Sequence, residues 1–116
     1  MPTEHDPSGQ MLKGNLDLLL LATLQGGPLH GYAISERLHL LSHGAFDVAE
    51  GTLYPALHRL EQTGLLTSQW SDEHARRRRV YALTSRGLAT LENRRQEWRA
   101  FAEGMEAVLW GEAPRG

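Results

Sequence analysis

Cysteine is absent from this sequence of 116 residues, so disulfides and thiolate metal sites are excluded. The longest apolar run, Leu18 to Ala22, is far too short to cross a bilayer. The polar first ten residues also lack the apolar segment of a signal peptide. From these absences we expect a cytoplasmic protein that makes no membrane contact.

Patterns typical of catalysis and metal binding are lacking as well. The six histidines show no HExxH spacing, no serine or aspartate lies in a nucleophile motif, and no glycine-rich phosphate loop follows a strand. We therefore expect a protein that is not an enzyme and that holds no cofactor and no metal.

Net charge is low, at −2, and by itself argues against a nucleic-acid partner. The charges are unevenly placed, however. Between Gly51 and Gly87 six arginines stand against three carboxylates, a local charge of +3, which leaves −5 on the rest of the chain. A basic surface on an acidic body can hold DNA phosphates, although a charge run of this size is also typical of a solvated face.

Apolar spacing predicts one small domain that is mainly α with a small β-hairpin. Residues 1–11, which hold two prolines, are expected to form a flexible arm, and residues 111–116 a tail. Leu53, Leu57 and Leu60 repeat at i, i+4 and i+7, so one face of their helix points to the core. The elements expected in chain order are helices at 14–25, 29–41 and 51–63, strands at 65–70 and 77–83, and a last helix at 85–110 with Thr84 as its N-cap.

The first and last predicted helices carry more apolar surface than a lone chain of this size can bury. The first is apolar nearly all round, which fits either a central core helix or a helix that packs on two subunits. The last follows a heptad pattern over three repeats. We therefore expect a homodimer, with Arg95 paired to Glu92, Glu97 or a carboxylate of the partner. The expected dimer contacts are Leu16, Leu20, Leu88, Leu91, Arg95, Trp98, Ala102, Met105 and Leu109.

Two short helices and a basic hairpin predict a winged helix-turn-helix over residues 12–84, with 85–110 as the dimerisation helix. The second helix of such a pair fits a major groove about 12 Å wide. On its outward face, Arg59 is placed to read a guanine edge or to bind phosphate. Thr52 and Tyr54 are placed to bond phosphate near the helix start. Tyr54 also fits a partly buried packing role, and His58 fits either a DNA contact or simple exposure.

The hairpin, or wing, carries the run Arg76 to Arg79. Side chains alternate along a strand, so Arg77 and Arg79 share one face and Arg76 and Arg78 the other. We expect Arg76 and Arg77, nearest the loop, to touch phosphates, and at least one of Arg78 and Arg79 to serve an internal ion pair. A charged edge strand that only resists aggregation is the alternative.

Four blocks of the sequence resemble the PadR family of bacterial transcriptional regulators, and the short length resembles its small-sized subgroup. They are GPLHGY at 27–32, EGTLYPALHRLE at 50–61, GLL at 64–66 and RRVYALT at 78–84. The resemblance implies a winged helix-turn-helix homodimer that represses at palindromic operators in double-stranded DNA and is released by a small molecule or a stress signal. It also implies that the last helix crosses to the partner subunit and packs with the first helix.

The residues that the resemblance places near DNA are the wing arginines, Tyr32, Thr52, Tyr54 and Pro55. A dimer of this kind would hold two recognition helices about 34 Å apart. A winged helix that binds proteins without binding DNA is the alternative function. The expected DNA-binding residues are Lys13, Tyr32, Thr52, Tyr54, Pro55, His58, Arg59, Arg76, Arg77 and Arg78.

Trp98 lies on the heptad seam, with Phe101 about one turn and Met105 about two turns further along the helix. This is similar to small PadR-type proteins whose interface tryptophans sandwich flat aromatic drugs. Trp98 and Phe101 are therefore candidates for contacting a planar aromatic effector. The same residues fit an ordinary dimer core, since aromatic anchors are common at any interface. Trp110, near the end, is expected to cap the bundle.

Overall fold

The four helices and the two hairpin strands expected from the sequence are all present, in the expected order. A computed structural model describes residues 7–72 and 77–111, and of residues 7–11 and 13 the backbone only. In this range the elements are α1 Pro7–Thr23, the 3-10 helix η1 Leu24–Gly26, β1 Leu29–His30, α2 Gly31–Leu41, α3 Glu50–Gln62, β2 Leu66–Ser71, β3 Arg78–Leu83 and α4 Ser85–Trp110. The prediction of a mainly α fold with a β-hairpin and a long last helix is confirmed.

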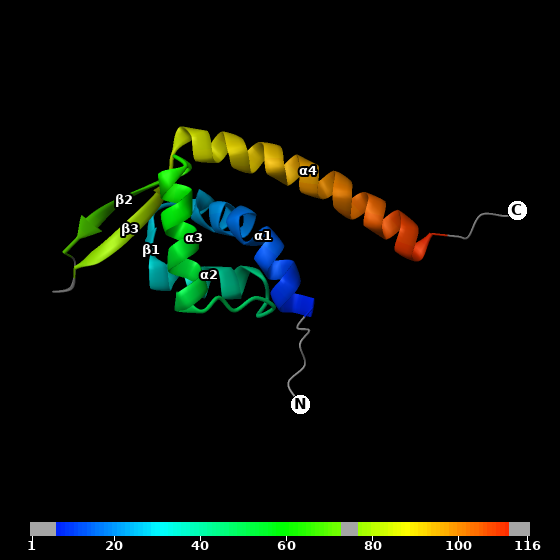
Figure 1. The fold of residues 1–116 in the computed structure, drawn as a ribbon, viewed down its shortest axis with the longest axis horizontal. Helices are drawn as coiled ribbons and strands as arrows, with labels where there is room; N and C mark the ends of the chain where they lie inside the picture. The colour runs from blue at the N-terminus through cyan, green and yellow to red at the C-terminus, as the bar shows by residue number, and fades with distance from the viewer. Residues whose placement is uncertain (1–6, 73–76, 112–116) are drawn as a thin grey trace, which may run out of the picture.

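The core lies where α1, α2 and α3 meet beside the base of the sheet (Figure 1). Leu20 of α1, Ile34 of α2 and Leu57 of α3 are fully enclosed there. The predicted apolar stripe of α3 does face the core, with Leu53 and Leu60 buried beside Leu57. Each such side chain stabilises the fold by about 1.5–3 kcal/mol, so this cluster holds α3 firmly against α1 and α2.

The hairpin is joined by a short third strand that the sequence pattern did not predict. β1 pairs antiparallel with β3, with Leu29 opposite Tyr81, and the strand order is β1-β3-β2. Residues 29–30, expected to begin a helix, are therefore extended, and the helix begins at Gly31. It begins there because the imidazole of His30 caps it, Nδ1 accepting from the Ala33 N–H at 3.3 Å.

The N-terminal arm is shorter than predicted. α1 begins at Pro7, so the residues 7–11 that were expected to be flexible are helical. Proline suits the first position of a helix, because the N–H that it lacks would have no partner there. Residues 1–6 of the predicted arm and 112–116 of the predicted tail lie outside the described residues.

Pro55 lies inside α3 without interrupting it. A proline ring crowds the carbonyl four residues earlier, which here belongs to Gly51 in the first turn. The amides of Thr52 and Leu53 already share the carbonyl of Ala49 as their acceptor, so the turn is closed before the proline. The helix can therefore carry Pro55 on its exposed side.

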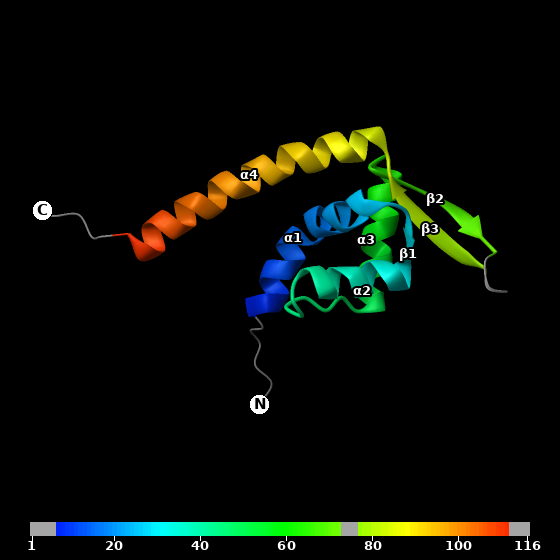
Figure 2. The same cartoon turned by 180° about the vertical axis from the view of Figure 1, so that it is seen from behind.

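α4 packs on the rest of the domain only over its first turns. A Cβ on Gly87 would overlap the carbonyl oxygen of Leu65, so glycine is needed for this close approach, and Leu91 is fully buried one turn on. Beyond it α4 runs past the body of the domain (Figure 2), with Val108 82% and Trp110 79% exposed. Of the helices that the structure describes, none has the length and apolar character to span a membrane.

Candidate nucleic-acid interface

One face of α3 is open to solvent along its length. Thr52, Pro55 and His58 are exposed on it, and the buried residues of the helix all lie on the opposite side. α3 itself lies beside the β2–β3 wing in both views of the fold (Figures 1 and 2). A helix with one free polar face next to a β-hairpin has the shape that enters a major groove.

Tyr54 has the partly buried packing role that was open for it, and its contact with DNA stays a prediction. Its side chain is 41% exposed on the flank of α3. Its ring also packs against Gly31 at the start of α2, where an added Cβ would lie 2.5 Å from the phenol oxygen. Tyr32, which follows Gly31 in α2, is 64% exposed. Gly31 thus allows α2 and α3 to approach closely, and two tyrosines lie at their junction.

Arg59 has an intrachain partner that the sequence pattern did not indicate. Its guanidinium Nη2 donates to Oδ1 of Asp17 on α1 at 2.8 Å. About half of the Arg59 side chain is still exposed. To read a guanine edge, Arg59 would have to leave Asp17.

The inner face of the wing is tied to α3 through one carboxylate. Glu61 accepts from the hydroxyl of Ser68 at 2.6 Å and from the guanidinium of Arg79 at 3.5 Å. Arg79 Nε also donates to Ser68 Oγ at 2.8 Å. The prediction that Arg78 or Arg79 serves an internal ion pair is confirmed, and the paired residue is Arg79.

Arg78 lies on the other face of β3, where its guanidinium Nη1 is 2.8 Å from Nε2 of His30. This contact links the wing to the N-cap of α2. Arg77 is exposed on the same side as Arg79, as the strand alternation predicts. Arg76 lies outside the described residues, and of Lys13 only the backbone, within α1, is described.

Trp70 is a surface residue of the wing that the sequence analysis did not single out. It is 52% exposed at the end of β2, directly opposite Arg79. Deeper on the same face Tyr81 is buried, and burial raises the pKa of its phenol, with the charge of Arg79 opposing the shift. The clue available from sequence was the period of two, which puts Trp70 on the Arg77 and Arg79 face once the hairpin register is known.

One comparison with known proteins decides the family to which this chain belongs. The family model described as the Transcriptional regulator PadR-like family matches residues 20–93, which cover α2, α3, the sheet and parts of α1 and α4. The chain belongs to this family. This PadR-like protein shares with its family the α2–α3 pair and the wing, and the resemblance noted in the sequence is confirmed.

Related proteins agree in sequence and in fold. Transcriptional regulator Rv3488 of Mycobacterium tuberculosis is 41% identical over 73% of this chain and 74% of its own length. A PadR family regulator of Eggerthella lenta superposes with a TM-score of 0.77 at 32% identity, covering 89% of this chain and 88% of the other. A PadR family transcription regulator of Clostridium difficile superposes with a TM-score of 0.73 at 34% identity, covering 83% of this chain and 99% of the other.

PadR family members are transcriptional regulators and not enzymes, which agrees with the expectation from the sequence. Within residues 7–72 and 77–111, no three histidine or carboxylate side chains are grouped as metal ligands.

The predicted dimer residues of this PadR-like protein fall into two groups. Leu16, Leu20 and Leu91 are buried in the chain's own core, so they have no surface left for a partner. The heptad pattern could not tell a core contact from a subunit contact, because both require apolar residues at the same spacing. The residues of the seam that stay at least 40% exposed are Leu88, Trp98, Met105 and Leu109, and Ala102 is partly exposed.

Arg95, the polar residue of the seam, bonds within its own chain. Its guanidinium lies 3.7 Å from the carboxylate of Glu92, one of the partners predicted for it. It also donates to the side-chain oxygen of Gln25 at 2.7 Å, beyond the end of α1. Arg95 therefore helps to hold α4 beside the first helix.

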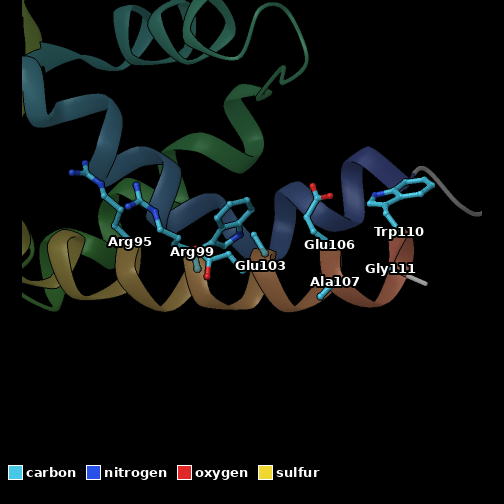
Figure 3. A pocket seen from close by; sticks show the side chains of 9 residues that line it. Arg95, Arg99, Glu103, Glu106, Ala107, Trp110 and Gly111 are labelled. Atoms are coloured by element: carbon cyan, nitrogen blue, oxygen red, sulfur yellow. The ribbon is translucent and has the colours of Figure 1, made fainter. Parts of the chain in front are cut away.

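Three hollows adjoin Trp98. The first, about 520 Å³, is apolar, lies between α1 and α4, and is lined by Asn15, Leu18, Leu19, Ala22, Phe46, Leu91, Arg95 and Trp98. The second, about 620 Å³, runs along α4 from Arg95 to Trp110. In Figure 3 Arg95 and Arg99 lie at one end of it and Trp110 at the other, with Glu103 and Glu106 between them. Phe101, the other candidate effector residue, lines a third hollow with Trp98 and Arg59.

Proposed function

We propose that this PadR-like protein is a homodimeric, sequence-specific DNA-binding repressor. The observation that carries the proposal is the placement of the open face of α3 beside the arginine-bearing face of the wing. Glu61 ties the two together through Ser68 and Arg79. A helix held in this way can enter a major groove while the hairpin meets the adjoining backbone.

The DNA contacts follow from position along α3 and the wing. Thr52 lies in the first turn of α3, where its side chain is exposed and the helix dipole favours a phosphate. His58 lies further along the open face and can reach a base edge. Arg59 and Arg78 would join only after leaving Asp17 and His30. The remaining proposed contacts are Lys13, Tyr32, Tyr54, Pro55, Arg76 and Arg77.

The homodimer is supported by the apolar residues that α4 leaves exposed. Trp98, Met105 and Leu109 repeat along one side of the helix and are each 44–59% exposed. Contiguous apolar surface of this kind marks an interaction site. A second copy that covers it by two-fold symmetry would set two α3 helices about 34 Å apart, matching a palindromic operator.

Release by a small molecule is the finer part of the proposal. The apolar hollow of about 520 Å³ beside Trp98 falls in the size range of sites for small ligands. A planar aromatic compound seated there against Trp98 would separate α1 from α4 and so alter the spacing of the two recognition helices. Phe101 would meet such a compound only from the adjoining hollow that it lines with Trp98. Loss of matching spacing would release the operator.

The test is a footprint on the DNA upstream of this protein's own gene, with and without cell extract. We expect a protected, palindromic segment, and protection that the extract abolishes if it contains the effector. Affinity should fall steeply with salt. A plot of log K against the logarithm of the salt concentration should have a slope of about −0.9 for each phosphate that the protein neutralises. Absence of protection on any duplex at low salt, with capture of a protein partner at a shallow salt slope, would favour the protein-binding alternative.

A further inference from the structure

The outer half of the wing presents one aromatic side chain that lies close to two guanidinium groups. The guanidinium carbon of Arg77 lies 4.8 Å, and that of Arg79 5.4 Å, from the ring centre of Trp70. Both separations are within the range at which a cation is attracted to an indole ring. Yet about half of the tryptophan remains exposed to solvent.

The face that carries Trp70 is the one turned toward α3. The hairpin register places Leu66 opposite Leu83, Ser68 opposite Tyr81 and Trp70 opposite Arg79 on this face. The pair Leu66 and Leu83 packs in or against the core. The pair Ser68 and Tyr81 lies against α3, where Ser68 donates to Glu61. Trp70 and Arg77 continue the same face beyond the body of the domain, on the side of the recognition helix.

The two arginines are held differently. Arg79 is braced by Ser68 and Glu61, so its position is set by α3. For Arg77 the contact that the structure describes is the ring of Trp70. An arginine side chain is long and flexible, and a stacked ring restricts the orientations of its guanidinium. Trp70 therefore orders Arg77 before any phosphate arrives.

We propose that Trp70 lies in the DNA interface of the wing, where it positions Arg77 for a phosphate and packs its exposed half on the sugar-phosphate backbone. The proposal rests on the proposed function, since it requires that the wing meets a duplex. It assigns to a tryptophan, and not to arginines alone, the ordering of the wing contact. Two cations beside an exposed indole suit the DNA backbone, because the cations can bind its phosphates and the indole can pack on its sugars.

The first test uses tryptophan emission. In the variant W98F/W110F, Trp70 is the only tryptophan left of the three. A duplex of about 30 base pairs, long enough for two half-sites one turn apart, is added at low salt while binding is followed by mobility shift. We expect Trp70 emission to change on binding and its quenching by acrylamide to decrease. If this double variant does not fold, the wild type is compared with Trp70→Phe, which should lack the change.

The second test separates positioning from simple stability. Trp70→Ala should weaken duplex binding about two- to five-fold and lower the salt slope by about one, as if the Arg77 contact were gone. Trp70→Phe should restore the slope, since an aromatic ring remains. Gln69→Ala, on the opposite face of the same strand, is the matched control and should change neither.

The outcomes are distinguishable. A duplex that binds while Trp70 emission stays unchanged, or a salt slope that survives in Trp70→Ala, overturns this inference and leaves the proposed function standing. Failure of the wild type to bind any duplex overturns both.

Discussion

Arg59 of α3 and Asp17 of α1 form an ion pair at 2.8 Å. The pair spans 42 positions of sequence and joins the helix proposed to read DNA to the helix that borders the apolar hollow. Both residues also line a hollow together with Trp98 and Phe101. A ligand or a partner helix that shifts α1 would therefore act on α3 through a direct contact.

The Asp17–Arg59 pair should contribute little to stability and nothing to base selection. Because both side chains are partly exposed, a double-mutant cycle with Asp17→Ala and Arg59→Ala should give a coupling of about 0.2–1 kcal/mol by urea unfolding. The coupling should shrink at high salt, because exposed charges are screened. If Arg59→Ala instead loses about 1–3 kcal/mol of binding at one base position, Arg59 leaves Asp17 to read a guanine.

Gly31→Ala tests the close approach of α2 and α3. The added Cβ would overlap the ring of Tyr54, so we expect overpacking to lower the free energy of unfolding by about 1–3 kcal/mol and to weaken DNA binding by displacing Tyr54. Gly104→Ala is the control, because its Cβ would meet open space on α4. It should stabilise the helix by about 0.5–1 kcal/mol. Equal effects of the two substitutions would show that the Tyr54 contact is unimportant.

Met105→Glu tests the proposed dimer surface. A carboxylate placed in the middle of an apolar interface loses its hydration, so we expect dimerisation to weaken at least about ten-fold. Sedimentation equilibrium measures the change. Ala100→Glu adds the same charge on the other side of α4 and should leave the association constant unaltered. A wild type that stays monomeric at every concentration would refute the proposed homodimer.

Trp98→Ala tests the proposed effector site. A planar cationic dye should quench tryptophan emission of the wild type, and the variant should bind it about three- to ten-fold more weakly, since stacking on the indole is lost. Trp110→Ala, near the end of α4, provides a control that keeps Trp98. Absence of quenching in the wild type, or the same quenching in Trp98→Ala, would assign Trp98 to the dimer surface alone.

Much of the fold was predictable because it depends on local spacing. The leucines of α3 repeat every three to four residues, and the alternation in β3 placed Arg77 and Arg79 on one face correctly. β1 was not predictable, because two residues form no pattern and their pairing with β3 joins segments about fifty residues apart. The start of α1 was missed because Pro7 is compatible with both an arm and a first helical turn.

For the candidate site, the helices and strands that carry it were predictable, but the intrachain contacts of its side chains were not. The exposed positions Thr52 and His58 follow from helix geometry. The engagement of Arg59 by Asp17 depends on the angle between α1 and α3, which no local pattern contains. Likewise, an apolar heptad pattern cannot distinguish a contact within the chain from a contact with a partner subunit. Leu91 packs within its own chain.

The central claim is tested most directly by selecting binding sites from a random duplex library with the purified protein and measuring its association state on the selected DNA. We predict enrichment of an inverted repeat with half-sites about 34 Å apart, bound by two chains with a steep salt dependence. Recovery of no preferred sequence, or binding of a single chain to an isolated half-site, would contradict the account.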